Sequence, residues 1–164
     1  MNLQLVTIGV YGFSSEHFFN ALVAANVEVF CDIRLRRGMR GSTYAFANSQ
    51  RLQQKLAELA IRYEHCKHLA PSLTTRMVQR EVDAALGEAK RQRQTLSTAF
   101  VESYEQECLT SLDIQHFVEL VGQETRIAAL CCVEQEPEAC HRSLLARHLA
   151  EALGIQVRHI KPSE

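Results

Sequence analysis

Five short segments of the chain carry the apolar residues typical of strands in a covered sheet. In the segment 127–133, apolar residues occupy both alternating sets of positions, so neither face of a strand there would be polar. The first segment, 3–8, has the same character. A strand without a polar face is usually covered on both sides, which is typical of the central strands of a parallel sheet. We therefore predict strands over residues 3–8, 27–33, 61–65, 127–133 and 155–160.

The residues between these segments show the spacing of apolar positions that is typical of helices. Ser14 or Ser15 is suited to cap the first helix, Pro137 to begin the last one, and Gly154 to end it. A single Gly87 weakens the third helix. Helices are expected over residues 14–25, 48–60, 74–93, 97–109, 113–121 and 137–153. The fourth and fifth of these are expected to pack together as a hairpin.

Strands that alternate with helices through short connections predict a parallel sheet with helices on both faces. The expected fold class is therefore α/β, a three-layer sandwich with a mostly parallel sheet of about five strands. A chain of 164 residues is long enough to bury a core, and we expect a single domain over residues 1–164.

Composition and charge narrow the classes of partner. The chain is 46% hydrophobic and 23% charged, with a net charge of −1, so its overall field does not indicate nucleic acid or an anionic membrane. The longest apolar run, 127–133, is far shorter than the ~20 residues that cross a bilayer. No secretory signal is visible at the amino terminus. We therefore expect a cytoplasmic protein. Its six cysteines include no CxxC pair, which argues against a disulfide framework.

The connection after the second strand is rich in arginine. Asp32 and Arg34 share a face at the end of that strand, and Arg36, Arg37 and Arg40 follow with no acidic residue among them. Arginine side chains suit the oxygens of carboxylates and phosphates. A solvated loop with scattered positive charge is an equally good interpretation of the run alone.

The loop after the fourth strand has the highest concentration of potentially catalytic or ligand-binding residues in the chain: Cys132, Glu134, Cys140, His141 and Arg142. Ligands of open α/β sheets bind outside the carboxyl ends of the strands. Because the arginine-rich loop leaves the same edge, we expect these five residues to line one pocket. Asp32 and Arg34 would line it too, with Tyr11 on its rim.

The cluster allows several kinds of chemistry. Cys132, Cys140 and His141 would suit a metal such as zinc, although their spacing is not a recurrent zinc motif and adjacent residues rarely bind one ion together. Alternatively, a helix amino terminus and His141 would stabilise a thiolate on Cys132 or Cys140. Arg142 and free backbone N–H groups would suit an anion. In a purely structural role, His141 and Glu134 would bond each other and fix the loop.

Several of these segments together resemble a known family. Thr7-Ile8-Gly9, Asp32-Ile33-Arg34, Phe46 with a leucine-bearing helix after it, Ile61-Arg62-Tyr63 and above all Cys132-x-Glu134…Pro137-x-x-Cys140-His141-Arg142 resemble the DUF488 family over residues 3–150. The resemblance implies a compact α/β domain of bacterial or archaeal type without an established activity. Many members have a histidine after the first strand, where this chain has Val10 and Tyr11, so no role of that imidazole carries over.

The leading hypothesis is an enzyme acting on a small anionic substrate such as a nucleotide or a modified base. Arg34 and Arg142 would hold the anion, with Arg36 and Arg37 nearby. Glu134 or Asp32 would be the acid or base. Cys132 or Cys140 would be the nucleophile beside His141.

Two alternatives come from other classes. One is a nucleic-acid or partner-binding module that uses the loop 34–40 and the basic segment 90–93. The other is a metal-binding protein. The sequence leaves the cofactor and the oligomeric state open.

Overall fold

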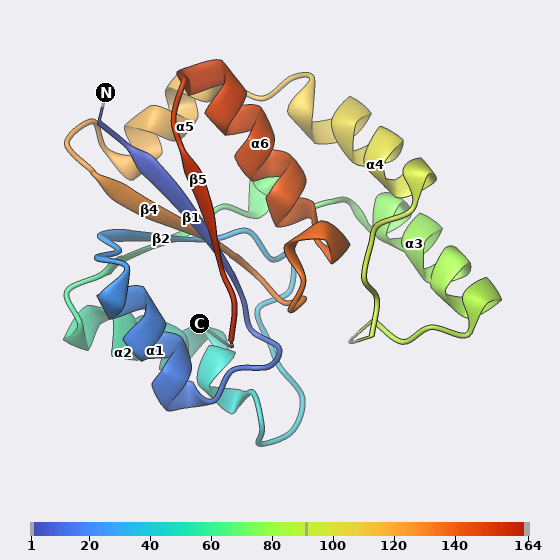
Figure 1. Ribbon diagram of the computed structural model, residues 1–164, viewed down its shortest axis with the longest axis horizontal. Coiled ribbons are helices and arrows are strands. Elements are labelled where there is room, and N and C mark those ends of the chain that lie inside the picture. The colour runs from blue at the N-terminus through green and yellow to red at the C-terminus, as the bar shows by residue number, and fades with distance from the viewer. Residues whose placement is uncertain (1, 91, 163–164) are drawn as a thin grey trace.

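The chain folds around one five-stranded, fully parallel sheet with helices on both faces (Figure 1). The structure is a computed structural model and describes residues 2–90 and 92–162. Across the sheet the strands are ordered β3 (Arg62–His65), β2 (Val29–Asp32), β4 (Ile127–Cys132), β1 (Gln4–Gly9) and β5 (Val157–Ile160). The expected fold class, an α/β sandwich with a parallel sheet of five strands, is confirmed.

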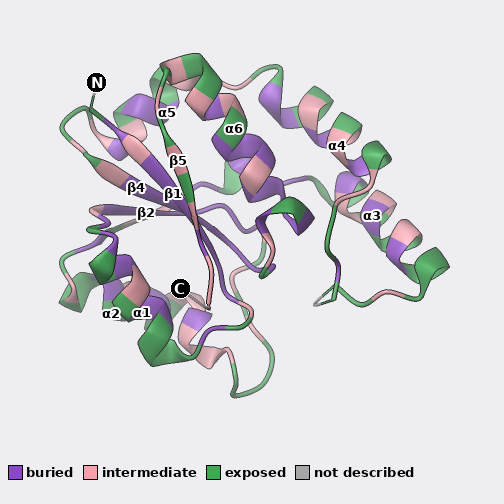
Figure 2. Ribbon diagram, in the orientation of Figure 1, coloured by how far each residue is buried: buried purple, intermediate pink, exposed green. Residues whose placement is uncertain are grey.

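The helices form two layers. Helices α1 (Ser15–Ala24) and α2 (Ser49–Glu58) cover one face of the sheet. The other face is covered by α4 (Thr98–Tyr104), α5 (Ile114–Val121) and α6 (His141–Leu153). Each face has its own apolar core, which is why the three central strands, β1, β2 and β4, are buried along almost their whole length (Figure 2).

Helix α3 (Leu73–Leu86) differs from the others in what it buries. Its buried residues are polar, namely Thr75, Gln79 and Asp83. The helix lies at the right-hand edge of Figure 1, beside α4, where it adds a wall beyond the carboxyl ends of the strands. The neighbour of α4 is therefore α3, and the expected hairpin of α4 with α5 is wrong.

Two helix boundaries differ from expectation. The third helix ends at Leu86 rather than continuing to residue 93, because Gly87 adopts a left-handed conformation with φ of 65° that terminates it. Pro137 begins a separate 3₁₀ turn, Pro137–Ala139, and α6 starts afterwards with Cys140 as its N-cap. The predicted cap of the first helix is confirmed, since Ser14 accepts a hydrogen bond from the backbone N–H of His17 at 3.2 Å.

The register brings the functional strand ends together. Gly9 at the end of β1 pairs with Cys132 at the end of β4, and Asp32 at the end of β2 pairs with Cys131. Residues that follow these three strands therefore emerge at the same edge of the sheet.

The end of β1 passes unusually close to the loop after β4, and only glycine fits there. A Cβ atom on Gly9 would overlap the carbonyl group of Glu134 and approach the guanidinium of Arg142. We expect Gly9→Ala to lower the free energy of unfolding, measured by urea titration, by about 1–3 kcal/mol or more. The backbone of Gly9 or of Glu134 has to move to make room for the added Cβ. The matched control is Gly38→Ala, whose added Cβ has its nearest neighbour at 4.0 Å. An equal loss in both variants would contradict this account of Gly9.

Candidate functional site

A cavity of about 390 Å³ lies at the carboxyl ends of β1, β2 and β4. Its walls come from Tyr11 after β1, the loop after β2, and Cys132 to Glu134 at the end of β4. The start of α6, together with α3, α4 and the segment between them, completes the lining. Segments that are distant in sequence therefore line the same cavity.

Arg34 is held at the cavity by a buried ion pair. Its Nε and Nη2 atoms each donate to one carboxylate oxygen of Asp32, both at 2.8 Å. Both side chains are almost completely buried. Burial opposes the charge of Arg34, but the hydrogen bonds and the charge of Asp32 raise its pKa. The remaining nitrogen, Nη1, is buried without a partner among the described residues.

Asp32 itself does not line the cavity, contrary to expectation. Because Asp32 pairs with Cys131 in the sheet, it points to the opposite face from Cys132. There it also accepts a hydrogen bond from Tyr63 Oη at 2.8 Å. Burial raises the pKa of Tyr63 to about 12, so the phenol stays protonated and donates at neutral pH. Asp32 is a positioning residue for Arg34.

The other arginines of the loop divide between two directions. Arg36 and Arg40 line the cavity. Arg37 lies outside the lining and donates from Nη1 to Tyr63 Oη at 3.3 Å, toward β3. Arg36 and Arg37 were both expected near the bound anion, but only Arg36 lines the cavity.

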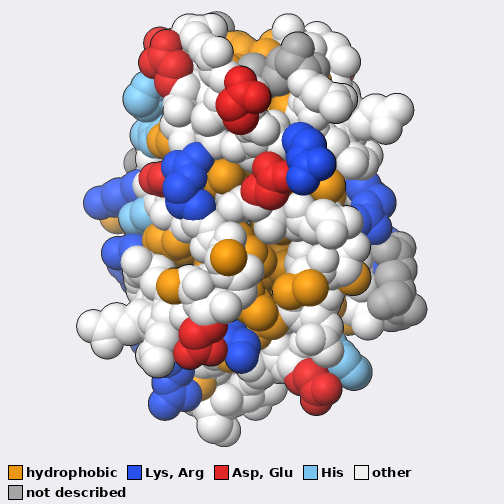
Figure 3. All heavy atoms as spheres, turned by 90° about the vertical axis from the view of Figure 1, so that its left-hand side faces the viewer, with side chains coloured by type: hydrophobic (Ala, Val, Ile, Leu, Met, Phe, Trp, Pro, Cys, Tyr) orange, Lys and Arg blue, Asp and Glu red, His pale blue; other side chains and the backbone are white. Residues whose placement is uncertain are grey.

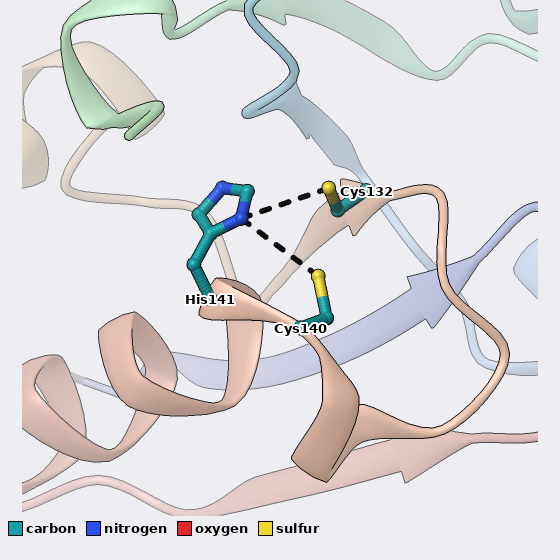
Figure 4. A group of neighbouring side chains, drawn as sticks. All are labelled: Cys132, Cys140 and His141. Carbon is teal, nitrogen blue, oxygen red and sulfur yellow. Dashed lines mark hydrogen bonds between the residues drawn. The ribbon is translucent and has the colours of Figure 1, made fainter. Parts of the chain in front are cut away.

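Cys132, Cys140 and His141 converge at the base of the cavity (Figure 4). His141 Nδ1 lies 3.7 Å from Cys132 Sγ and 3.8 Å from Cys140 Sγ. On the other side of the ring, Nε2 lies 3.1 Å from the carbonyl oxygen of Ile33. A carbonyl only accepts, so Nε2 carries the proton and the lone pair of a neutral ring is on Nδ1, between the sulfurs.

Adjacent Cys140 and His141 reach the same point because the backbone changes conformation between them. Cys140 is extended, with φ of −137° and ψ of 145°, and its Sγ caps α6 by accepting from the backbone N–H of Arg142 at 3.5 Å. Burial opposes ionisation of Cys140, but the hydrogen bond with Cys132 and the charge of His141 lower its pKa well below the ordinary range. The same hydrogen bond and burial raise the pKa of Cys132. The two sulfurs are thus chemically different.

Glu134 lines the cavity and is held there by hydrogen bonds and ion pairs with basic residues. Its Oε1 accepts from Arg93 Nη2 at 3.0 Å and lies 3.4 Å from Lys90 Nζ. Arg93 also donates to Asp83 at 2.7 Å. Glu134 and His141 do not bond each other, as a purely structural role of the cluster would require, because each has other partners. Glu134 Oε2 is buried without a partner among the described residues.

Arg142 lies beneath the loop rather than in the cavity lining, so its expected place in the pocket is wrong. The guanidinium is fully buried and donates to the carbonyls of Glu134 and Gln135 and to Thr7 Oγ1. These contacts engage all three side-chain nitrogens of Arg142, Nε, Nη1 and Nη2. Arg142 therefore holds the loop in place.

Helix α3 supplies cations that the sequence analysis missed, and the segment after it adds two that were expected only on a nucleic-acid or partner-binding surface. Arg76 and Arg80 line the cavity from α3, and Lys90 and Arg93 line it from the following segment. Burial lowers the pKa of Arg76, and the nearby positive charge of Arg80 lowers it further. The i, i+4 spacing of Arg76 and Arg80 is a visible signal, but the sequence does not show which way that face points.

The described lining as a whole is strongly cationic. Seven lysine and arginine residues face the cavity against two carboxylates, those of Asp83 and Glu134. By contrast, acidic and basic side chains are interspersed on the face where β1 and β4 begin (Figure 3). The near-neutral net charge of the chain therefore conceals a local cationic concavity. No helix in the described part of the chain is both long and apolar enough to cross a membrane.

Comparisons with known proteins identify a family and no more specific relative. The model of the family described as "Domain of unknown function DUF488" matches residues 14–149. The matched region includes Asp32-Ile33-Arg34 and the segment from Cys132 to Arg142, whereas Thr7-Ile8-Gly9 precedes it. No curated protein and no solved structure matches the chain.

The bridge from Arg93 to Asp83 and Glu134 yields a stability prediction. We expect Arg93→Met to lower the free energy of unfolding by about 3–5 kcal/mol, because two largely buried carboxylates lose their cation. Lys90→Met is the control, since its side chain is 42% exposed and should contribute at most about 1 kcal/mol. Urea titrations followed by circular dichroism measure both. Similar losses in the two variants would mean that the buried bridge is not what stabilises this wall.

Proposed function

We propose, for a chain that belongs to the DUF488 family, that its cavity binds a small anionic ligand of nucleotide-like size and that the protein acts on this ligand as an enzyme. The family description states no activity, so the proposal rests on the site. A volume of about 390 Å³ lies in the range of small-molecule pockets. Its place at the carboxyl ends of parallel strands is the usual one for ligands of α/β sheets.

The observation that carries the proposal is the unpartnered guanidinium nitrogen of Arg34. A buried hydrogen-bond donor without an acceptor costs free energy, and an anionic oxygen would satisfy it. Asp32 fixes the orientation of this donor through two hydrogen bonds, so little ordering is needed on binding. Arg76 and Arg80 add charge from the wall that α3 forms.

The lining also suits a ligand with an apolar or aromatic part. Tyr11, Met39, Leu96 and Phe100 contribute apolar surface among the cations. A flat ring bearing a phosphate or carboxylate fits this combination. Its reacting atoms would lie against Cys132, Cys140 and His141, with Glu134 as the acid or base.

A nucleic-acid-binding module is the alternative, and the geometry favours it less. Of the four arginines of the loop, Arg34 is tied to Asp32 and Arg37 is bonded to Tyr63. Only Arg36 and Arg40 remain exposed at the mouth of the cavity. A concave site of this kind suits a small anion better than an extended backbone.

Binding of AMP and of inorganic pyrophosphate, measured by calorimetry, tests the proposal. We expect Arg76→Gln to weaken binding by about 10-fold or more, because it removes a charge-assisted contact from the cavity. Arg51→Gln is the matched control. It makes the same change in charge on α2, outside the cavity, and should alter affinity less than about 2-fold.

Two outcomes would overturn this proposal. One is that neither anion binds at low ionic strength. The other is that a single-stranded oligonucleotide binds with steep salt dependence and Arg36→Ala with Arg37→Ala weakens it while Arg76→Gln does not, which would support the nucleic-acid alternative.

A further inference from the structure

We propose that Cys132, Cys140 and His141 form a binding site for one zinc-like divalent cation, with a fourth coordination position open to the cavity. The inference is independent of the anionic ligand, since it concerns only these three side chains and the ion they would hold.

The distances from the ring nitrogen of His141 to the two sulfurs match the spacing that a tetrahedral ion requires. Sγ of both cysteines and a ring nitrogen of His141 all lie within 4.8 Å of one another, and no other such group of three occurs among the described residues. Bond lengths of about 2.3 Å to sulfur and 2.0–2.1 Å to nitrogen place neighbouring donors of a tetrahedral site roughly 3.6 Å apart. The observed nitrogen-to-sulfur distances are 3.7 and 3.8 Å.

The imidazole of His141 is oriented as a metal ligand would be. Its Nε2–H donates to the carbonyl of Ile33, which directs the Nδ1 lone pair at the point between the two sulfurs (Figure 4). Metal-binding histidines usually bond a carbonyl or carboxylate through the other ring nitrogen, because this bond fixes both tautomer and orientation. Tyr104 packs edge-on against the ring at 5.4 Å and limits its rotation.

The backbone elements hold the three ligands rigidly. Cys132 ends a central strand, Cys140 caps a helix of 13 residues, and His141 is the first residue of that helix. All three side chains are almost fully buried, with at most 5% of each residue exposed, yet each lines the cavity. An ion among them would therefore be accessible only from the cavity.

The chemistry of the donors selects the ion. Two thiolates and one imidazole favour zinc over calcium or magnesium, which prefer oxygen ligands. Three protein ligands with an open fourth position are typical of catalytic rather than structural zinc. Glu134 lines the same cavity but is not one of the three ligands. Its carboxylate would be the proton acceptor in the cavity for a water molecule bound at the fourth coordination position.

The test uses the full-length protein, reduced and stripped with a chelator, and titrated with Co²⁺ or Zn²⁺ in the absence of any anionic ligand. We expect one Co²⁺ per chain with thiolate-to-cobalt charge-transfer absorption, and one Zn²⁺ by elemental analysis. Cys132→Ser and His141→Ala should each weaken Co²⁺ binding by more than about 100-fold, since loss of a ligand should exceed the 10–100-fold cost of losing an outer-shell partner.

Cys131→Ser is the matched control, because Cys131 is adjacent, equally buried and on the opposite face of the sheet. It should leave Co²⁺ binding within about 2-fold of the wild type. A second measurement needs no variant. One equivalent of Zn²⁺ should protect Cys132 and Cys140 of the wild type from iodoacetamide, and a chelator should reverse the protection.

Three outcomes would overturn the proposal. These are uptake of less than a stoichiometric amount of metal, a Co²⁺ spectrum without thiolate bands, and rapid alkylation of Cys140 that Zn²⁺ does not slow. The last would indicate a free reactive thiolate instead. Because no anion is present, these results leave the anion-binding proposal to its own test.

Discussion

The site depends on a buried arginine beneath the loop that follows β4. Arg142 is fully buried, and its guanidinium donates to the carbonyls of Glu134 and Gln135 and to the side chain of Thr7. These contacts tie the loop to β1 and to the start of α6 together. The close approach requires the missing side chain of Gly9. The backbone of the loop that carries Glu134 is therefore held against β1.

A second set of contacts fixes the opposite side of the cavity. The residues after β2 are tied to their surroundings through backbone carbonyls, with His141 bonded to Ile33 and His65 bonded to Arg34. The ion pair of Asp32 and Arg34 belongs to the same segment. The hydrogen bond from His141 to Ile33 also joins the residues after β2 directly to α6. The position of Arg34 therefore depends on that of the helix start that carries Cys140 and His141. Such preorganisation lowers the entropy lost on binding an ion or a ligand.

The wall formed by α3 explains why a nearly neutral chain has a cationic cavity. This helix buries polar rather than apolar residues, and its buried face contacts the cavity instead of the sheet. Like charges gathered there repel one another, which is unfavourable unless carboxylates or a ligand offset them. The bridge from Arg93 to Asp83 and Glu134 offsets part of that repulsion and fastens the wall to the loop after β4.

The sequence by itself determined the elements and the edge of the sheet where chemistry gathers. Runs without a polar face predicted the strands, and parallel strands bring their carboxyl ends to one edge, so the meeting of Arg34 with Cys132 followed from local patterns. It did not determine which distant side chains contact one another. Burial patterns record how much of a residue is covered, but not which distant group covers it.

Only the tertiary structure decided that Asp32 faces away from the cavity, that Arg142 holds the loop, and that adjacent Cys140 and His141 converge on one point. It likewise decided that α3 turns its arginines inward. Each of these depends on register, on a change of backbone conformation at a helix start, or on packing between elements far apart in the chain. Local periodicity carries no information on such long-range geometry.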